Sequence, residues 1–246
     1  MSKKIREINP DTYKKMILNQ DQVLQFYKMC DAAWVHNGDL SAPHGILSTP
    51  DPVSGEDRHT NGYFNSPKVL GYTNICMILA WQLIQKLMIR GVKVHTIDYV
   101  VGSSYSAVTL SFAVAYYLNA VHVFAQKDPS DPNGKKMIFK DDLEGGSTLL
   151  HIEELMTMAG TLYKVHDAVL KKNPDKGLIF LPVVGTLVHR PEKLPVKYSL
   201  SGTPIQTVSL IEQEVWAIKQ SKCDLCKAGS EALSPKIHWD KLTGKA

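Results

Sequence analysis

The feature that most constrains the fold is an alternation of apolar runs and helical patterns between residues 97 and 210. Short runs rich in Val, Ile and Phe predict buried strands at residues 97–102, 120–127, 135–139, 176–185 and 204–210. Helical patterns lie between them at residues 106–119 and 148–160. Strands that alternate with helices form a mostly parallel sheet covered on both faces. We therefore expect an α/β fold with a twisted, mostly parallel sheet flanked by helices.

The two ends of the chain do not follow this alternation. Ahead of it, a strong helical pattern runs from Thr73 to Ile89 and ends at Gly91, a suitable C-cap. We expect residues 1–246 to form a single domain, in which a small hood is built from about residues 30–68 and 200–246.

Composition and charge exclude several classes of protein. With 246 residues, 44% hydrophobic and 21% charged, the chain is an ordinary globular protein. A net charge of +4 without a dense Lys/Arg stripe argues against a nucleic-acid partner. The N-terminus lacks an apolar signal core, and Gln82, Gln85 and Lys86 interrupt the longest apolar stretch. We expect a cytoplasmic protein with no membrane partner.

Two predicted strand ends carry groups that suit a phosphate-bearing ligand. One is the turn "GSSYS" at residues 102–106, and the other is Asp141 and Asp142, followed by "GGST" at residues 145–148. Ligands of open α/β sheets bind at the carboxyl ends of strands, and a glycine turn that opens a helix presents unpaired N–H groups to anions. Adjacent carboxylates can hold a ribose diol or the water ligands of Mg²⁺. Each motif alone is usually a turn or a solvated loop, but their combination favours a binding site.

In this order the motifs resemble the type I phosphoribosyltransferases. That family has an apolar strand, two acidic residues, a short Thr/Gly loop and a helix. The resemblance implies that Asp141 and Asp142 hold the ribose hydroxyls of phosphoribosyl pyrophosphate (PRPP) and, through them or through water, Mg²⁺. It implies a phosphate loop made of Gly145, Gly146, Ser147 and Thr148. It also implies a pyrophosphate-contacting turn made of Gly102, Ser103, Ser104, Tyr105 and Ser106.

One spacing departs from the family pattern. Members have two apolar residues and Thr-Thr or Thr-Ala between the acidic pair and the loop glycine. Here only Leu143 and Glu144 separate Asp142 from Gly145.

Further segments resemble the orotate phosphoribosyltransferases within that family. "RHTNGYFNSPKVL" at residues 58–70 is similar to their "SGRHS" segment, "LVHRPEK" to the segment after their fifth strand, and "CDLCKAGSEAL" to the "CPLCKQG" tail of some members. The resemblance implies that Arg58, His59 and Arg190 contact the base. Candidates for a catalytic lysine on a mobile loop are Lys127, Lys135 and Lys136.

The activity that the resemblance implies is transfer of the phosphoribosyl group from PRPP to a pyrimidine base, with orotate favoured. Such a transferase of pyrimidine biosynthesis depends on Mg²⁺, releases pyrophosphate and is expected to be a homodimer. The altered loops favour an alternative, a protein that binds PRPP or a nucleotide as a sensor or assembly subunit without turnover. A purine base is a third option.

Two residues near the C-terminus, Cys223 and Cys226, form a single CxxC motif. A structural zinc ion needs four ligands, and along the sequence only His238 lies nearby. A surface or hinge pair is therefore favoured over a metal site, although a partner chain could complete one. The nine histidines show no HExxH or His-x-His spacing.

Overall fold

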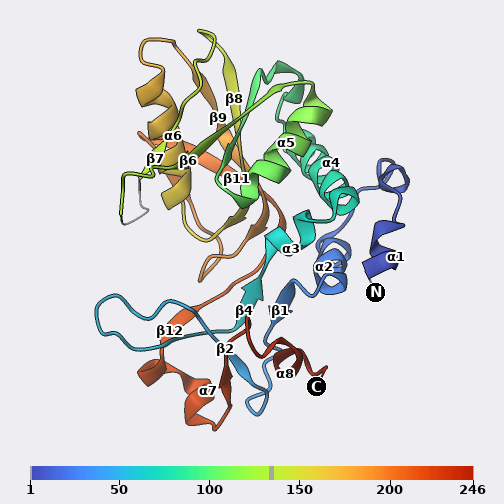
Figure 1. Ribbon diagram of the computed structural model, residues 1–246, viewed down its shortest axis with the longest axis vertical. Helices are drawn as coiled ribbons and strands as arrows, with labels where there is room; N and C mark the ends of the chain where they lie inside the picture. The colour runs from blue at the N-terminus through green and yellow to red at the C-terminus, as the bar shows by residue number, and fades with distance from the viewer. Residues whose placement is uncertain (1, 133–135, 246) are drawn as a thin grey trace.

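The computed structural model describes residues 2–132 and 136–245. A seven-stranded sheet with helices on both faces forms the larger layer, and smaller sheets lie below it in the view of Figure 1. The strands of the large sheet are β5 (Tyr99–Ser103), β6 (Val121–Lys127), β7 (Met137–Ile138), β8 (Thr148–Met156), β9 (Ile179–His189), β10 (Tyr198–Leu200) and β11 (Thr203–Glu212).

The strand order of the large sheet is β10-β11-β9-β8-β5-β6-β7. The five central strands are parallel, and β10 and β7 pair antiparallel at the two edges. The predicted α/β fold with a mostly parallel sheet is confirmed.

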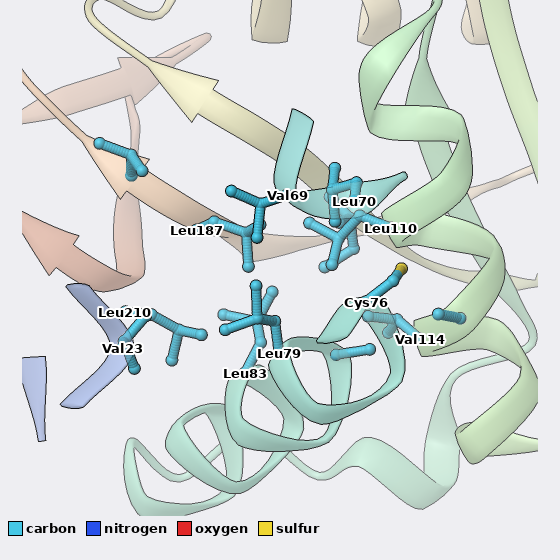
Figure 2. Packing of buried hydrophobic residues seen from close by; sticks show 14 of the residues in the cluster. Val23, Val69, Leu70, Cys76, Leu79, Leu83, Leu110, Val114, Leu187 and Leu210 are labelled. Carbon is cyan, nitrogen blue, oxygen red and sulfur yellow. The ribbon is translucent and has the colours of Figure 1, made fainter. Parts of the chain in front are cut away.

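Helices cover both faces of this sheet. α4 (Thr73–Ile89) and α5 (Ser106–Leu118) lie on one face, and α6 (Gly160–Lys172) lies on the other (Figure 1). Alternate residues of β5 supply the two cores, because successive side chains of a strand point to opposite faces. Val100 packs in the core with α4 and α5, whereas Val101 packs with α6. Figure 2 shows the first of these cores, in which Leu79 and Leu83 of α4 face Leu187 of β9.

The helix expected from Thr73 to Ile89 is present with these bounds. Gly91 follows it with φ +85°, a left-handed conformation that glycine adopts without a steric penalty. The prediction of a helix at residues 148–160 is wrong. Thr148–Met156 form strand β8, and α6 begins only at Gly160.

The smaller layer is built from two distant parts of the chain. β1 (Ala33–Val35) pairs with β4 (Gly62–Phe64). A four-stranded sheet has the order β12-β3-β2-β13. Its strands are β2 (His44–Ile46), β3 (Arg58–Thr60), β12 (Ala217–Lys219) and β13 (Ala232–Leu233). We call these two small sheets, with the helices that follow β12 and β13, the hood. Its C-terminal part begins later than expected from residue 200, because residues 203–212 form β11 of the large sheet.

The remaining helices are short. They are α1 (Ser2–Arg6), α2 (Gln20–Met29), α3 (Ser66–Leu70), α7 (Asp224–Lys227) and α8 (Trp239–Thr243), with 3₁₀ turns at Pro10–Tyr13, Val94–Thr96 and Gln220–Lys222. Across the described ranges, no helix combines the length and the apolar character that a membrane span requires.

Candidate functional site

The order of strands defines where a ligand is expected. From β5 the chain passes to β6 on one side, and then returns to β8 on the other side of β5. Ligands of open α/β sheets bind outside the carboxyl ends of the strands at such a switch point. The candidate site therefore lies where β5 and β8 end, at Ser103 and Met156.

Two adjacent glutamates of β8 stand at this switch point. Glu153 is buried, with 4% of its surface exposed, and both of its carboxylate oxygens accept hydrogen bonds. Ser103 Oγ donates to Glu153 Oε2 at 2.7 Å, and His151 Nε2 lies 2.9 Å from Glu153 Oε1. These bonds fix the carboxylate between β5 and β8.

The second glutamate, Glu154, points toward the turn that opens α5. Its side chain is hydrogen-bonded to Ser106, the first residue of that helix. Burial, followed by the charge of Glu153, raises the pKa of Glu154 to about 7. A carboxyl group with such a pKa changes charge near neutral pH and gains from a nearby cation.

A short loop then connects β8 to α6. It contains Thr157, which is exposed, and Met158, which is 77% exposed. No side chain caps the N-terminus of α6 at Ala159. The first N–H groups of a helix have no partner within it, and they carry a partial positive charge that attracts anions. A pocket of about 480 Å³ borders the loop and is lined on its other side by residues 191–198.

The turn predicted at residues 102–106 lies at the same switch point. Its first two residues, Gly102 and Ser103, end β5, a cis peptide bond joins Ser104 to Tyr105, and Ser106 begins α5. Gly102 is required there, because a Cβ atom would overlap Ser111 Oγ and lie 3.0 Å from Ser111 Cβ. The Tyr105 side chain is 82% exposed at the lip of the site.

By contrast, Asp141 and Asp142 lie at the opposite end of the sheet. Both are exposed and precede β8, and Asp142 forms a 2.8 Å ion pair with Lys172 at the end of α6. The Leu143 N–H donates to Asn173 Oδ1, just beyond that helix. These aspartates do follow a strand, the two-residue β7, but the expectation that a helix comes after their loop is wrong, because β8 follows instead.

The "GGST" segment is likewise at the amino end of β8. The Gly146 N–H donates to the carbonyl of Lys176, and Ser147 Oγ donates to the carbonyl of Glu144. The Thr148 N–H donates to Asp98 Oδ2, so residues 145–148 form a turn into a strand rather than a loop before a helix.

Glu153 and Glu154 are the residues that sequence reasoning missed. They lie near the end of an apolar strand, and Leu155, Met156 and the loop at residues 157–159 separate them from α6, which begins at Gly160. This is the order described above for the type I phosphoribosyltransferases, with Thr-Met-Ala at residues 157–159 where that family has Thr-Thr or Thr-Ala before the glycine. The segment "EELMTMAG" carries this signal, but its apolar spacing also fits the helix expected at residues 148–160.

The candidate lysines are placed only in part. Lys127 ends β6, and its N–H donates to Ser104 Oγ at 3.3 Å, so its backbone adjoins the turn after β5. Lys136 is exposed on the returning segment, where its carbonyl accepts from the N–H of Asp128. Lys135 lies outside the described residues.

Of the three residues expected at the base, Arg190 is the one that remains near the sheet. It follows β9, and its N–H donates to the carbonyl of Met156 at 2.8 Å. Burial lowers the pKa of Arg190. The interaction with the charge of Tyr63 acts in the opposite direction and raises it. Its buried Nε has no hydrogen-bond partner among the described residues.

The other two residues belong to β3 of the hood. Arg58 Nε donates to the carbonyl of Thr49 at 3.0 Å. His59 is 1% exposed, and its Nδ1 lies 2.9 Å from His44 Nε2, so this side chain has no free surface to offer a base.

Comparison with known proteins gives two kinds of result, although no protein-family model matches the sequence. The chain is 25% identical over 218 residues to the orotate phosphoribosyltransferase of Caldicellulosiruptor bescii, covering 89% of this chain and 97% of the relative. The corresponding enzyme of Caldicellulosiruptor saccharolyticus is 26% identical over the same length.

Solved structures show the same fold at lower identity. Orotate phosphoribosyltransferase from Aeropyrum pernix aligns with a TM-score of 0.54 and 14% identity, covering 76% of this chain and 92% of that one. UMP synthase of Leishmania donovani aligns with a TM-score of 0.50 and 13% identity, over 91% of this chain and 41% of that longer chain. The resemblance to the phosphoribosyltransferases is confirmed.

Proposed function

We propose that this distant relative of the orotate phosphoribosyltransferases binds Mg²⁺ and PRPP at the switch point and transfers the phosphoribosyl group to a pyrimidine base, with orotate favoured. The observation that supports this proposal is the meeting of two glutamates, the loop at residues 157–159 that leads into Gly160 of α6, and the Ser-rich turn before α5. The curated relatives that carry the name orotate phosphoribosyltransferase favour this class of substrate.

In this proposal Glu153 and Glu154 take the role first given to Asp141 and Asp142. Both oxygens of Glu153 already accept hydrogen bonds, so Glu154 is the better candidate for direct contact with a ribose hydroxyl or the ion. The residues fit Mg²⁺, which is commonly held by one or two carboxylates together with substrate phosphates. When bound, the ion would neutralise charge on the leaving pyrophosphate.

The two loops would hold the two ends of PRPP. Residues 157–160 and the first N–H groups of α6 would bind the 5′-phosphate, and residues 102–106 would contact the pyrophosphate. In the reaction a base nitrogen forms a bond to C1 of the sugar and loses its proton to solvent, and the C1–O bond breaks, so that pyrophosphate leaves with the electron pair. The protein would contribute by positioning both reactants and by stabilising the leaving group.

Cationic side chains would complete the site. Lys127 and Lys136 remain candidates for contact with the pyrophosphate, and the half-buried side chain of Arg190 is a candidate for contact with the base. We also propose a homodimer, in which the lysine-bearing segment of one subunit reaches the site of its partner.

Calorimetric titration with Mg²⁺ and PRPP, followed by orotate and an assay for released pyrophosphate, tests the proposal. Replacing both Glu153 and Glu154 with Gln should weaken PRPP binding by at least about tenfold, since charged hydrogen bonds contribute about 1.5–3 kcal/mol each. The matched control replaces Asp141 and Asp142 with Asn at the far end of β8, which should leave affinity unchanged.

Each outcome decides between the functions. Pyrophosphate release by the unmodified protein supports the transferase, and the control variant should retain it. PRPP binding without turnover of any base would support the sensor instead. If the protein does not bind PRPP, or if the aspartate variant alone loses binding, the proposed site is wrong. Thermal unfolding of each variant separates lost binding from lost folding.

A further inference from the structure

Four potential metal ligands converge inside the hood, away from the residues of the proposed active site. His44 Nε2 lies 2.9 Å from His59 Nδ1 and 3.5 Å from Cys223 Sγ. Cys226 Sγ lies 3.4 Å from His44 Nε2 and 3.2 Å from His59 Nδ1. All four atoms lie within 4.8 Å of one another.

These distances resemble the edges of a small tetrahedron. Zinc takes histidine nitrogen at about 2.0–2.1 Å and cysteine sulfur at about 2.3 Å, so neighbouring donors of a tetrahedral site are roughly 3.3–3.8 Å apart. The observed separations are close to this range.

A hydrogen bond behind the cluster sets the tautomer of one histidine. Ser230 Oγ donates its proton to the carbonyl of Ala42 at 2.6 Å, so it can only accept from His44 Nδ1, which lies 2.7 Å away. His44 therefore carries its proton on Nδ1 and presents the lone pair of Nε2 to the other three ligands. Such support behind a ligating histidine is typical of metal sites.

The charges also match a divalent ion. His44, His59 and Cys223 are buried, and Cys226 is half-buried. Two thiolates and two neutral imidazoles would balance the charge of Zn²⁺, so the loaded site would be neutral in a place where an unpaired charge is costly. Two soft thiolates with two imidazoles in tetrahedral array favour zinc over magnesium or calcium.

The position of the cluster gives the metal a structural task. His44 and His59 lie on β2 and β3, whereas Cys223 and Cys226 lie at the start and within α7, more than 160 residues later in the chain. The hood strands have two or three residues each, and the cluster of buried apolar residues beside them contains only Trp34, Leu233 and Leu242. Small units with so little core commonly depend on a metal or disulfides.

We propose that His44, His59, Cys223 and Cys226 bind a structural zinc ion that joins the C-terminal segment to the β2–β3 hairpin. The CxxC pair is then half of a four-ligand site rather than a surface or hinge pair. His238, the nearby histidine in sequence, is not among the four. With four protein ligands the ion has no open position for substrate, so its task is to hold the hood together.

Metal analysis of the purified protein tests this proposal, by elemental analysis and by the visible spectrum after replacement of zinc with Co²⁺. We expect about one zinc per chain and the absorption of a tetrahedral Co²⁺–thiolate site. Cys226→Ala should lose at least about nine-tenths of the zinc, since a closed site needs all four ligands. The matched control is Cys30→Ala, which removes another buried cysteine that lies outside the cluster.

Two further measurements keep the test valid if Cys226→Ala does not fold. A strong chelator should lower the unfolding temperature of the unmodified protein, and it should increase the reactivity of Cys226 toward a thiol reagent. Protein that holds no zinc after zinc-replete expression and gives no tetrahedral Co²⁺ spectrum would overturn the proposal. Full zinc occupancy in a folded Cys226→Ala protein would overturn it too. Neither result would bear on PRPP binding at β5 and β8.

Discussion

Ser103 Oγ donates a 2.7 Å hydrogen bond to Glu153 Oε2 and so ties the carboxyl end of β5 to that of β8. Both side chains are buried, and the bond crosses the line at which the strand order reverses. A hydrogen bond to a carboxylate is among the stronger kinds in proteins. The position of Glu153 therefore depends on a residue of the neighbouring strand.

Ser103→Ala should loosen this carboxylate and raise the Kd for Mg²⁺ and PRPP by about threefold to tenfold. The control is Ser147→Ala, which removes a hydroxyl from the other end of β8 and should leave the Kd unchanged. Calorimetric titration measures both variants. Equal affinities for Ser103→Ala and the unmodified protein would show that this hydrogen bond has no part in binding.

PRPP binding should depend on pH through Glu154. Its pKa is raised to about 7, so the carboxyl group is mostly neutral at pH 6 and mostly ionised at pH 8. Because only the ionised form attracts Mg²⁺, affinity should rise across this interval. Glu154→Gln should remove that part of the rise, and the remaining slope then belongs to the phosphates of PRPP. Parallel pH profiles for the two proteins would contradict the assignment.

Glu154 should also make the folding stability depend on pH. Its contribution to stability should fall as the pH rises, whereas PRPP affinity should increase. In the folded state the pKa of Glu154 lies near 7, above its ordinary value of 4.5, so the folded protein binds the proton more tightly. Its contribution to stability is present below pH 4.5 and is lost as the pH rises to 7. Glu154→Gln should therefore be more stable than the unmodified protein at pH 8, by about 1 kcal/mol after allowance for partial exposure, and should show no such gain at pH 4. Denaturant titrations at the two pH values measure this difference.

Replacing Gly102 or Gly160 with Ala should have different effects on the free energy of unfolding, so the two variants can be compared directly. A Cβ atom at Gly102 would overlap the side chain of Ser111, whereas none of the described atoms lies within 4 Å of a Cβ built at Gly160. We expect Gly102→Ala to lower the free energy of unfolding by about 1–3 kcal/mol, as overpacked sites do. Gly160→Ala should be neutral or slightly stabilising. A neutral Gly102→Ala would mean that α5 can move away from β5 at little cost.

The sequence predicted the half of the site that depends on local signals. Gly102 stands between a short Val-rich run and a helical pattern, so the strand, turn and helix of residues 99–118 were all expected from neighbouring residues. The helix Thr73–Ile89 was equally clear, because its apolar residues are continuous and a glycine follows it.

β8 could not be recognised in the same way. A strand buried on both faces shows no alternation of apolar and polar residues, and Leu149, Ile152 and Met156 happen to be spaced as on one face of a helix. Its extended form is set by pairing with β5 and β9, which lie far away in the sequence. A helix at residues 148–160 places the expected acidic pair ahead of it, at Asp141 and Asp142.

Only the CxxC half of the four-residue cluster in the hood is visible in the sequence, for a related reason. His44 and His59 follow no metal-binding spacing, and they meet only because β2 and β3 pair antiparallel. The segment that carries Cys223 and Cys226 reaches them because β12 pairs with β3 and β13 with β2. No local pattern records these long-range pairings.

The two-part construction of the hood sets an order of assembly during synthesis. β2 and β3 leave the ribosome early, yet their outer partners β12 and β13 are made only after every strand of the large sheet. Until then the hairpin exposes two unpaired edges, which are prone to pair with other chains. The newly made protein should therefore be most vulnerable to aggregation and proteolysis just before β12 and β13 emerge, and folding yield should fall most steeply when the segment that carries them is delayed or lost.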